Sequence, residues 1–339
     1  MDKEKFRSFL KARESSEEKL NALVAIAERY EAFLGGTAGG TAAEVIGKTP
    51  AAGGKEPSAR SVLEFARLLT KEGADVYENF RGLALYGRYT RNNDVYVAAI
   101  QFLDGAEALE SLYEKVGQAV GPARRDEIFR GLRLPRLGTP STERPRFTQA
   151  FIERLVKHVD AETVRKLLSG GLRRIPDEEY HDTRLKYLEC KSVDEYLDRK
   201  SAAFVEELER IKNEGGLYFN QEITDEVLEF VKSTPEICRG VVRDGVFYET
   251  KIPYMAKEYL AESDPRMKRY YYCHCPWVRE SLRTGDADVP RVFCHCSLGF
   301  TKQPWQVIFG QQLEGEVLET VLSGGMVCRF AIKLPADVR

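Results

Sequence analysis

The spacing of apolar side chains predicts that the chain begins with helix. Leu20, Leu23 and Ile26 recur at the three- and four-residue intervals that place side chains on one helix face. Ser16 stands before two glutamates, a pattern typical of a helix N-cap. Residues 1–34 are therefore expected to form a helical segment.

Helical periodicity returns after a segment that is poor in large apolar side chains. Residues 35–57 are rich in glycine, alanine and threonine, which cannot bury enough side chain to fix the backbone, so a flexible linker or loop is predicted. The clearest later pattern opens with Ser192-Val193-Asp194-Glu195, the signature of a capping box. The helical patterns cover residues 58–134, 147–158, 161–169 and 193–212.

After residue 215, β-branched and aromatic residues become frequent. Asp244-Gly245 lies between two such runs, which is the signal of a tight β-hairpin. A second hairpin is predicted around Gly324, with strands over 316–322 and 326–334. Alternate residues of its last strand are apolar and are expected on one face of a sheet.

The predicted fold class is α+β, because helices precede the strands instead of alternating with them. A mainly helical N-terminal part is followed by a smaller, antiparallel β-containing metal-binding part. The expected divisions are an N-terminal helical segment (1–34), the linker or loop (35–57), a helical domain (58–215) and an α+β domain with paired Cys-His-Cys motifs (216–339).

Composition and charge exclude several classes of protein. The 51 Lys and Arg residues against 53 Asp and Glu residues give a net charge of −2, which is not the balance of a general nucleic-acid binder. With 43% hydrophobic and 31% charged residues, the 339-residue chain has the composition of a soluble folded protein. No apolar stretch is long enough to cross a bilayer and no secretory signal is visible, so we expect a cytoplasmic protein with neither membrane nor nucleic acid as a partner.

The cysteines carry the candidate chemistry. Two Cys-His-Cys tripeptides, separated by 18 residues, hold four of the seven: Cys273, Cys275, Cys294 and Cys296. Without an export signal, such clustering indicates a metal or redox site before it indicates disulfides. The other three stand alone and are interpreted as core or surface thiols: Cys190, Cys238 and Cys328.

The spacing within each tripeptide predicts a four-thiolate site. In an extended chain, residues two apart point to the same side, so each tripeptide can direct two sulfurs to one point. Four thiolates are expected around one tetrahedral ion. His274 and His295 are then expected to contact the ligands or to lie elsewhere, and not to bind the ion. A tight turn at Cys275-Pro276 would instead let a histidine replace one cysteine. Zinc is the expected metal and an iron–sulfur cluster the alternative, since soft thiolates suit both; exchangeable disulfides are a third interpretation.

The surroundings of the tripeptides are basic and aromatic. Residues 263–310 hold seven basic and four acidic side chains, an excess that would offset a metal–thiolate centre, favour thiolate over thiol and attract an anion. A small anionic ligand is expected to bind beside the sulfurs, against Tyr272, Trp277, Arg279 and Arg283. Two other histidines are interpreted as structural, and no catalytic residue is assigned: His158 and His181.

Three runs of residues resemble a prokaryotic family of unknown function with paired Cys-His-Cys motifs. They are 248–255 (YETKIPYM), 270–277 (YYYCHCPW) and 293–297 (FCHCS). The closing run 319–330 (ETVLSGGMVCRF) is similar to the last hairpin of L-2-amino-thiazoline-4-carboxylic acid hydrolase-like proteins and of 4-vinyl-reductase-type small-molecule-binding domains. The resemblance covers about residues 217–335.

The resemblance implies an α+β ligand-binding domain, a thiol-ligated metal, and a role as a hydrolase or as a ligand sensor. No catalytic residue carries over to this chain. The expected function is therefore a zinc-binding protein that binds or hydrolyses a small anionic molecule, for which a sulfur-containing compound is one candidate. The alternatives are a sensing module with a purely structural four-cysteine site, and a thiol redox or iron–sulfur protein.

Overall fold

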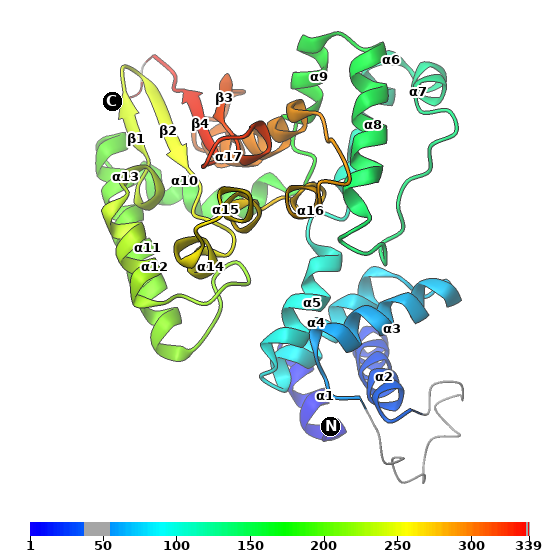
Figure 1. The fold of residues 1–339 in the computed structure, drawn as a ribbon. Helices are drawn as coiled ribbons and strands as arrows, with labels where there is room; N and C mark the ends of the chain where they lie inside the picture. The colour runs from blue at the N-terminus through cyan, green and yellow to red at the C-terminus, as the bar shows by residue number, and fades with distance from the viewer. Residues whose placement is uncertain (37–54, 337, 339) are drawn as a thin grey trace. The chain divides into compact units, whose positions relative to one another are not determined.

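The computed structural model describes residues 1–36, 55–336 and 338, and it confirms an α+β fold, mostly helical with one small antiparallel sheet (Figure 1). The chain divides into two compact units. Unit 1 comprises Met1–Ala106 and Pro135–Glu143, and unit 2 comprises Glu107–Leu134 and Arg144–Arg339. The expected boundary near residue 215 falls inside unit 2, and most of the expected linker lies outside the described residues.

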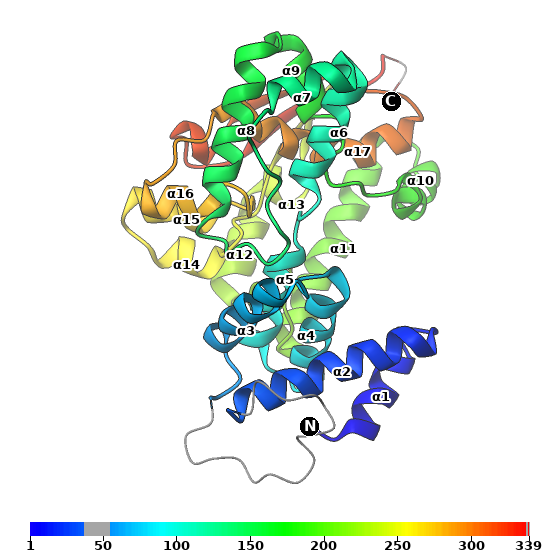
Figure 2. The ribbon, with the colours of Figure 1, turned by 90° about the vertical axis from the view of Figure 1, so that its right-hand side faces the viewer.

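Unit 1 is built from the helices that the periodicity predicts, and Figure 2 shows them from a second side. Ser16 caps the second helix, since its side chain accepts a hydrogen bond from the Lys19 N–H. Gly87 allows two helices to approach closely, because a Cβ there would lie 2.5 Å from the Tyr96 nitrogen. The helices are α1 (Lys3–Lys11), α2 (Glu17–Leu34), α3 (Ala59–Glu72), α4 (Tyr77–Tyr89) and α5 (Asn93–Leu103).

Unit 2 holds the remaining helices. The helix predicted from Ser192 is confirmed: the Ser192 hydroxyl accepts a hydrogen bond from the Glu195 N–H, while the Glu195 carboxylate accepts one from Lys191 N–H. No helix in the described ranges is long and apolar enough to cross a membrane. The elements before the sheet are α6 (Ala108–Val120), α7 (Pro122–Ile128), α8 (Arg144–His158), α9 (Ala161–Leu168), η1 (Asp177–Tyr180), α10 (His181–Leu188), α11 (Val193–Glu214), α12 (Asp225–Ser233) and α13 (Pro235–Cys238).

The sheet of unit 2 has four antiparallel strands in the order β1-β2-β4-β3. They are β1 (Val241–Arg243), β2 (Val246–Thr250), β3 (Gly315–Glu319) and β4 (Arg329–Lys333). The first hairpin is confirmed, with Asp244 and Gly245 both in the left-handed region that such a turn requires. Between the two hairpins run α14 (Ala256–Ala261), α15 (Pro265–Tyr272), α16 (Arg279–Thr284), η2 (Arg291–Cys294) and α17 (His295–Phe309).

Helix α17 packs on the sheet and positions its own N-terminal end beside the cysteines. Trp305 on α17 contacts Phe247 of β2, with ring centroids 4.5 Å apart. Both side chains belong to the same buried cluster as Ile332 of β4. In Figure 1, α17 lies beside β3 and β4. Burial of this apolar face therefore fixes where the start of α17 lies.

The closing hairpin is confirmed in its pairing, but its predicted extent is wrong. Strand β4 begins at Arg329, and a 3-10 turn, η3 (Val321–Ser323), occupies part of the predicted first strand. The Thr320 hydroxyl accepts the Ser323 N–H at 3.2 Å, and the Glu319 carboxylate accepts the Met326 N–H at 2.7 Å. In this part of the hairpin, these local hydrogen bonds take the place of the strand-to-strand hydrogen bonds that the sequence predicts. Cys328 consequently lies just before β4 and not on the apolar face of a strand.

Candidate functional site

Five cysteines lie in three segments of unit 2 that pack around one hydrophobic core. Cys273 ends α15 and Cys275 follows it; Cys294 ends η2 and Cys296 lies in the first turn of α17; Cys328 precedes β4. We call these five residues the thiol cluster. Four of them belong to, or pack against, one hydrophobic core, and η3, which shortly precedes Cys328, contacts both α15 and η2.

The thiol cluster is unbridged and partly accessible. No disulfide joins any of the seven cysteines, all of which are described. Cys273 is buried, whereas the other four members are each partly exposed. The thiol groups of Cys294, Cys296 and Cys328 are nevertheless desolvated, since burial raises the pKa of each.

The first tripeptide begins where helix α15 ends, so Cys273 can adopt the extended backbone that the four-thiolate prediction assumes. Cys273 has extended backbone angles, φ −71° and ψ 118°, and it terminates α15. The His274 Nε2 lies 2.6 Å from the Ile252 carbonyl oxygen, so this nitrogen carries the ring proton. Burial lowers the pKa of His274 to about 3, and the ring is neutral at pH 7.

The second tripeptide is helical, and the prediction that it is extended is wrong. Cys294 has φ −63° and ψ −13°, and His295 has φ −62° and ψ −21°. Residues two apart on a helix are separated by roughly 200° around its axis, so they do not face each other. The Cys294 and Cys296 side chains therefore leave the backbone in different directions. The His295 Nδ1 lies 2.9 Å from the Val292 carbonyl oxygen, and burial lowers its pKa.

The electrostatics of the thiols follow from burial. Burial raises the pKa of Cys273, and the neighbouring thiols of Cys275, Cys328 and Cys294 raise it further. Burial likewise raises the pKa of Cys294, and Cys328 is the strongest of its thiol neighbours. Desolvation, more than any neighbouring charge, therefore sets the protonation of these two thiols.

The expected preference for thiolate is not found. Burial raises the pKa of Cys296 to about 11, despite the opposing charges of Arg173 and Lys251. Burial also raises the pKa of Cys328. The local excess of basic side chains is therefore outweighed by desolvation.

Lys251 is a desolvated cation near the sulfurs. Its Nζ donates a hydrogen bond to the Ser297 Oγ at 2.8 Å and lies 4.9 Å from the centre of the Phe300 ring. Burial lowers its pKa, an effect opposed by the charge of Glu249 and by the thiols of Cys328 and Cys296. No carboxylate in the described part of the chain forms an ion pair with this ammonium group.

Arg279 is a second buried cation in this region. Its guanidinium lies 4.4 Å from the centre of the Tyr254 ring, and its backbone N–H donates to the Cys275 carbonyl at 2.9 Å. The Nε atom is buried and has no hydrogen-bond partner within the described residues. Arg283, by contrast, forms an ion pair with Glu280 at 2.7 Å.

The aromatic residues expected at a ligand site are packed into the core. Tyr272 is fully buried and its hydroxyl donates a hydrogen bond to the Lys251 carbonyl. Trp277 is buried, and its carbonyl accepts a hydrogen bond from the Thr148 hydroxyl at 2.9 Å. Of the four residues expected to bind an anion, Arg279 has the clearest unused hydrogen-bonding capacity.

The described residues hold no group of three Cys, His, Asp or Glu side chains already arranged to coordinate one ion. Metal binding by the thiol cluster would therefore require side chains to turn toward the ion. Such adjustment is ordinary, since metal sites are commonly completed by the metal itself.

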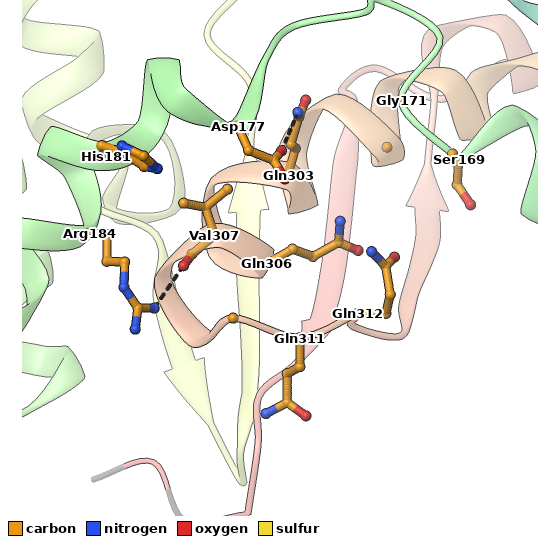
Figure 3. A pocket seen from close by; sticks show the side chains of 13 residues that line it. Ser169, Gly171, Asp177, His181, Arg184, Gln303, Gln306, Val307, Gln311 and Gln312 are labelled. Atoms are coloured by element: carbon orange, nitrogen blue, oxygen red, sulfur yellow. Dashed lines mark hydrogen bonds between the residues drawn. The ribbon is translucent and has the colours of Figure 1, made fainter.

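A separate polar cavity lies on another face of α17. Its volume is about 690 Å³, and its walls come from the end of α9, from η1, α10 and α17 (Figure 3). Arg184 donates to the Val307 carbonyl at 2.8 Å, and Gln303 donates to Asp177 at 3.0 Å. No member of the thiol cluster lines it, whereas His181 does. Sequence patterns gave no signal for this cavity because its residues come from segments more than 100 positions apart.

Comparison of the chain with protein-family models, curated proteins and solved structures found no match. The fold and the site therefore define the protein as an α+β chain with a cluster of unbridged cysteines in unit 2. The family resemblance seen in the sequence stays a prediction.

Proposed function

We propose that unit 2 binds a metal ion, with zinc expected, through the thiol cluster. The observation that carries this proposal is that cysteines from three separate segments belong to, or pack against, one hydrophobic core. Soft sulfur ligands in this number suit zinc, and an iron–sulfur cluster is the alternative.

The unpaired cations support an anionic centre. Lys251 and Arg279 lie beside the sulfurs, and neither forms an ion pair with a carboxylate among the described residues. A desolvated cation without a counter-charge is unfavourable. A divalent ion with four thiolates has a formal charge of −2 and would supply that counter-charge.

The raised thiol pKa values make a redox role less favourable than metal binding. A thiol with a pKa of about 11, as in Cys296, is almost wholly protonated at neutral pH and is a poor nucleophile. A bound metal ion displaces the thiol proton outright, so the same burial does not prevent metal binding.

A small anionic molecule is the second part of the proposal. The buried Nε of Arg279 has hydrogen-bonding capacity left, and the desolvated ammonium group of Lys251 forms no ion pair with a carboxylate among the described residues. Both groups suit a carboxylate or a similar anion. The proposal is limited to binding, because we assign no base or nucleophile of a hydrolase among the described residues.

Zinc titration of chelator-treated protein tests the metal proposal. We expect one ion per chain in the wild type, and binding weakened at least about tenfold in Cys294→Ser. Cys190→Ser is the matched control, because Cys190 lies outside the thiol cluster, and it should bind as the wild type does. Equal binding by both variants contradicts the proposal.

A further inference from the structure

We propose that the polar cavity on α17 binds a free α-amino acid with a polar side chain, with the ligand's carboxylate at Arg184 and its ammonium group at Asp177. This function goes beyond metal binding and is independent of it, because no member of the thiol cluster lines the cavity. All of the lining residues belong to unit 2. The site is therefore built within one compact unit.

The cavity follows one face of α17. Gly299, Gln303, Gln306, Val307 and Gly310 line it, at the intervals that place residues on one side of a helix. The facing wall comes from the end of α9, from η1 and from α10, and both η1 and α10 contact α17 (Figure 3). This polar face of the helix is therefore covered in part by other elements of the chain.

Hydrogen bonds hold the two charged groups of the facing wall against α17. The Gln303 Nε2 donates to the Asp177 carboxylate at 3.0 Å. The Arg184 Nη1 donates to the Val307 carbonyl at 2.8 Å and to the carbonyl of Ile308. No residue of α10 is buried, so these polar contacts, more than apolar packing, position Arg184.

Both charged groups keep hydrogen-bonding capacity. The Nη2 and Nε of Arg184 have no partner among the described residues. The Asp177 carboxylate accepts a hydrogen bond only from the Gln303 amide, and neither charge forms an ion pair within the described part of the chain. A cation and a carboxylate that line one cavity without pairing suit a ligand that carries both opposite charges.

The spacing of the two charges fits an amino acid. Gln303 and Val307, which hold them, are about 6 Å apart along the axis of α17. In an α-amino acid the nitrogen and the carboxyl carbon are about 2.5 Å apart. A charge-assisted hydrogen bond of about 2.8 Å at each end extends this span to about 8 Å. Such a ligand can therefore bridge the helical turn between the two anchoring residues.

The charges disfavour other classes of small ligand. A phosphate would meet the like charge of Asp177, and a polyamine would meet that of Arg184. A large apolar molecule would find one apolar side chain among the described lining residues, that of Val307. A zwitterion satisfies both charges at once.

Amide side chains line the rest of the cavity. The Gln306 Oε1 accepts the Leu313 N–H at 3.3 Å, and the Gln306 Nε2 has no partner in the described ranges. Gln311 and Gln312 line the cavity as well. The volume of about 690 Å³ leaves room for a ligand side chain beyond the two charged groups. Because amides both donate and accept hydrogen bonds, they favour a polar side chain such as that of glutamine or serine.

Isothermal titration calorimetry of the 339-residue chain with the standard L-amino acids tests the proposal. We expect at least one polar amino acid to bind with a Kd below about 1 mM. The analogue that lacks its α-amino group, and the α-amide that lacks its carboxylate, should each bind at least about tenfold more weakly. No binding by any amino acid, equal binding of either analogue, or tighter binding of phosphate or glycerol overturns the proposal.

Two variants locate the bound amino acid. Asp177→Asn removes the charge but keeps an acceptor for Gln303, so the affinity should fall at least about tenfold. Glu178→Gln is the matched control, because Glu178 is exposed and does not line the cavity, and it should bind as the wild type does. Equal affinities in the two variants overturn the assignment to this cavity. The analogue series uses the wild type alone, so its result stands even if a variant disturbs η1.

Discussion

The backbone N–H of Lys251 donates a 3.0 Å hydrogen bond to the carbonyl of Cys328, one step beyond the last pair of the β2–β4 ladder. This pairing places Lys251 beside a cysteine that stands alone in the sequence. Because burial lowers the pKa of Lys251 while nearby thiols oppose that shift, the charge of Lys251 and the charge of the sulfurs are linked.

The first prediction concerns that cation. Replacing Lys251 with Met removes a desolvated charge, so metal-free protein should be no less stable, whereas zinc affinity should fall about tenfold because the thiolate centre loses its counter-charge. Thermal melting with and without zinc measures both effects. Lys257→Met is the control, since Lys257 is exposed and pairs with Glu222. A wild-type zinc affinity in Lys251→Met would contradict the charge argument.

Metal removal should act on unit 2 alone. A metal ion bound by the thiol cluster would join segments that are otherwise held by packing, and its binding energy would contribute to folding. After chelation, or in Cys275→Ser, hydrogen exchange should accelerate in α15, η2 and the residues around Cys328, while α1–α5 of unit 1 keep their protection. Two results would argue against a metal-linked core. One is hydrogen exchange that accelerates equally in both units, and the other is unchanged exchange in unit 2 after metal loss has been confirmed.

The close approach at Gly299 predicts a local destabilisation. A Cβ at Gly299 would lie 2.7 Å from the Ser169 carbonyl oxygen, so Gly299→Ala should lower the free energy of unfolding by about 1–3 kcal/mol. The control is Gly216→Ala, where the nearest atom would be 3.6 Å away, and a change within about 0.5 kcal/mol is expected. Denaturant unfolding compares them. Equal stabilities would show that α17 can shift freely at this point.

The buried imidazole of His274 predicts how stability depends on pH. Its pKa in the folded protein is about 3, below the value of about 6.5 for an unfolded chain. Between these values the unfolded state binds a proton that the folded state does not, so stability falls as the pH falls from about 6.5 toward 3. His274→Gln, which keeps a side-chain donor for the Ile252 carbonyl, should show a shallower decline. Denaturant midpoints across this range, measured with chelator, test it; identical slopes would contradict it.

Local chemistry explains which parts of the fold are readable from the sequence. Ser192 caps its helix and Asp244-Gly245 forms its turn because the responsible atoms lie within four residues of each other. The strand pairing of the closing hairpin can be predicted from the sequence, because Phe330 and Ile332 are apolar, two residues apart and both buried. Each of these features needs only neighbouring residues.

The arrangement of the cysteines depends on contacts that neighbouring residues do not specify. The conformation of Cys294 and Cys296 follows from the start of α17, which is fixed by packing of Trp305 against the sheet. The place of Cys328 follows from pairing with β2, some 80 residues earlier. The two tripeptides therefore locate the candidate site, while its third segment emerges only from the tertiary structure.

Metal content of the wild-type protein, purified without chelator or added metal, tests the central claim most directly. Elemental analysis should give about one zinc per chain in colourless protein, bound through thiolates of the cluster. A brown protein with iron and sulfide would move the assignment to an iron–sulfur cluster. Less than about 0.2 equivalents of any transition metal would contradict the account, because a metal that contributes to folding is retained through purification.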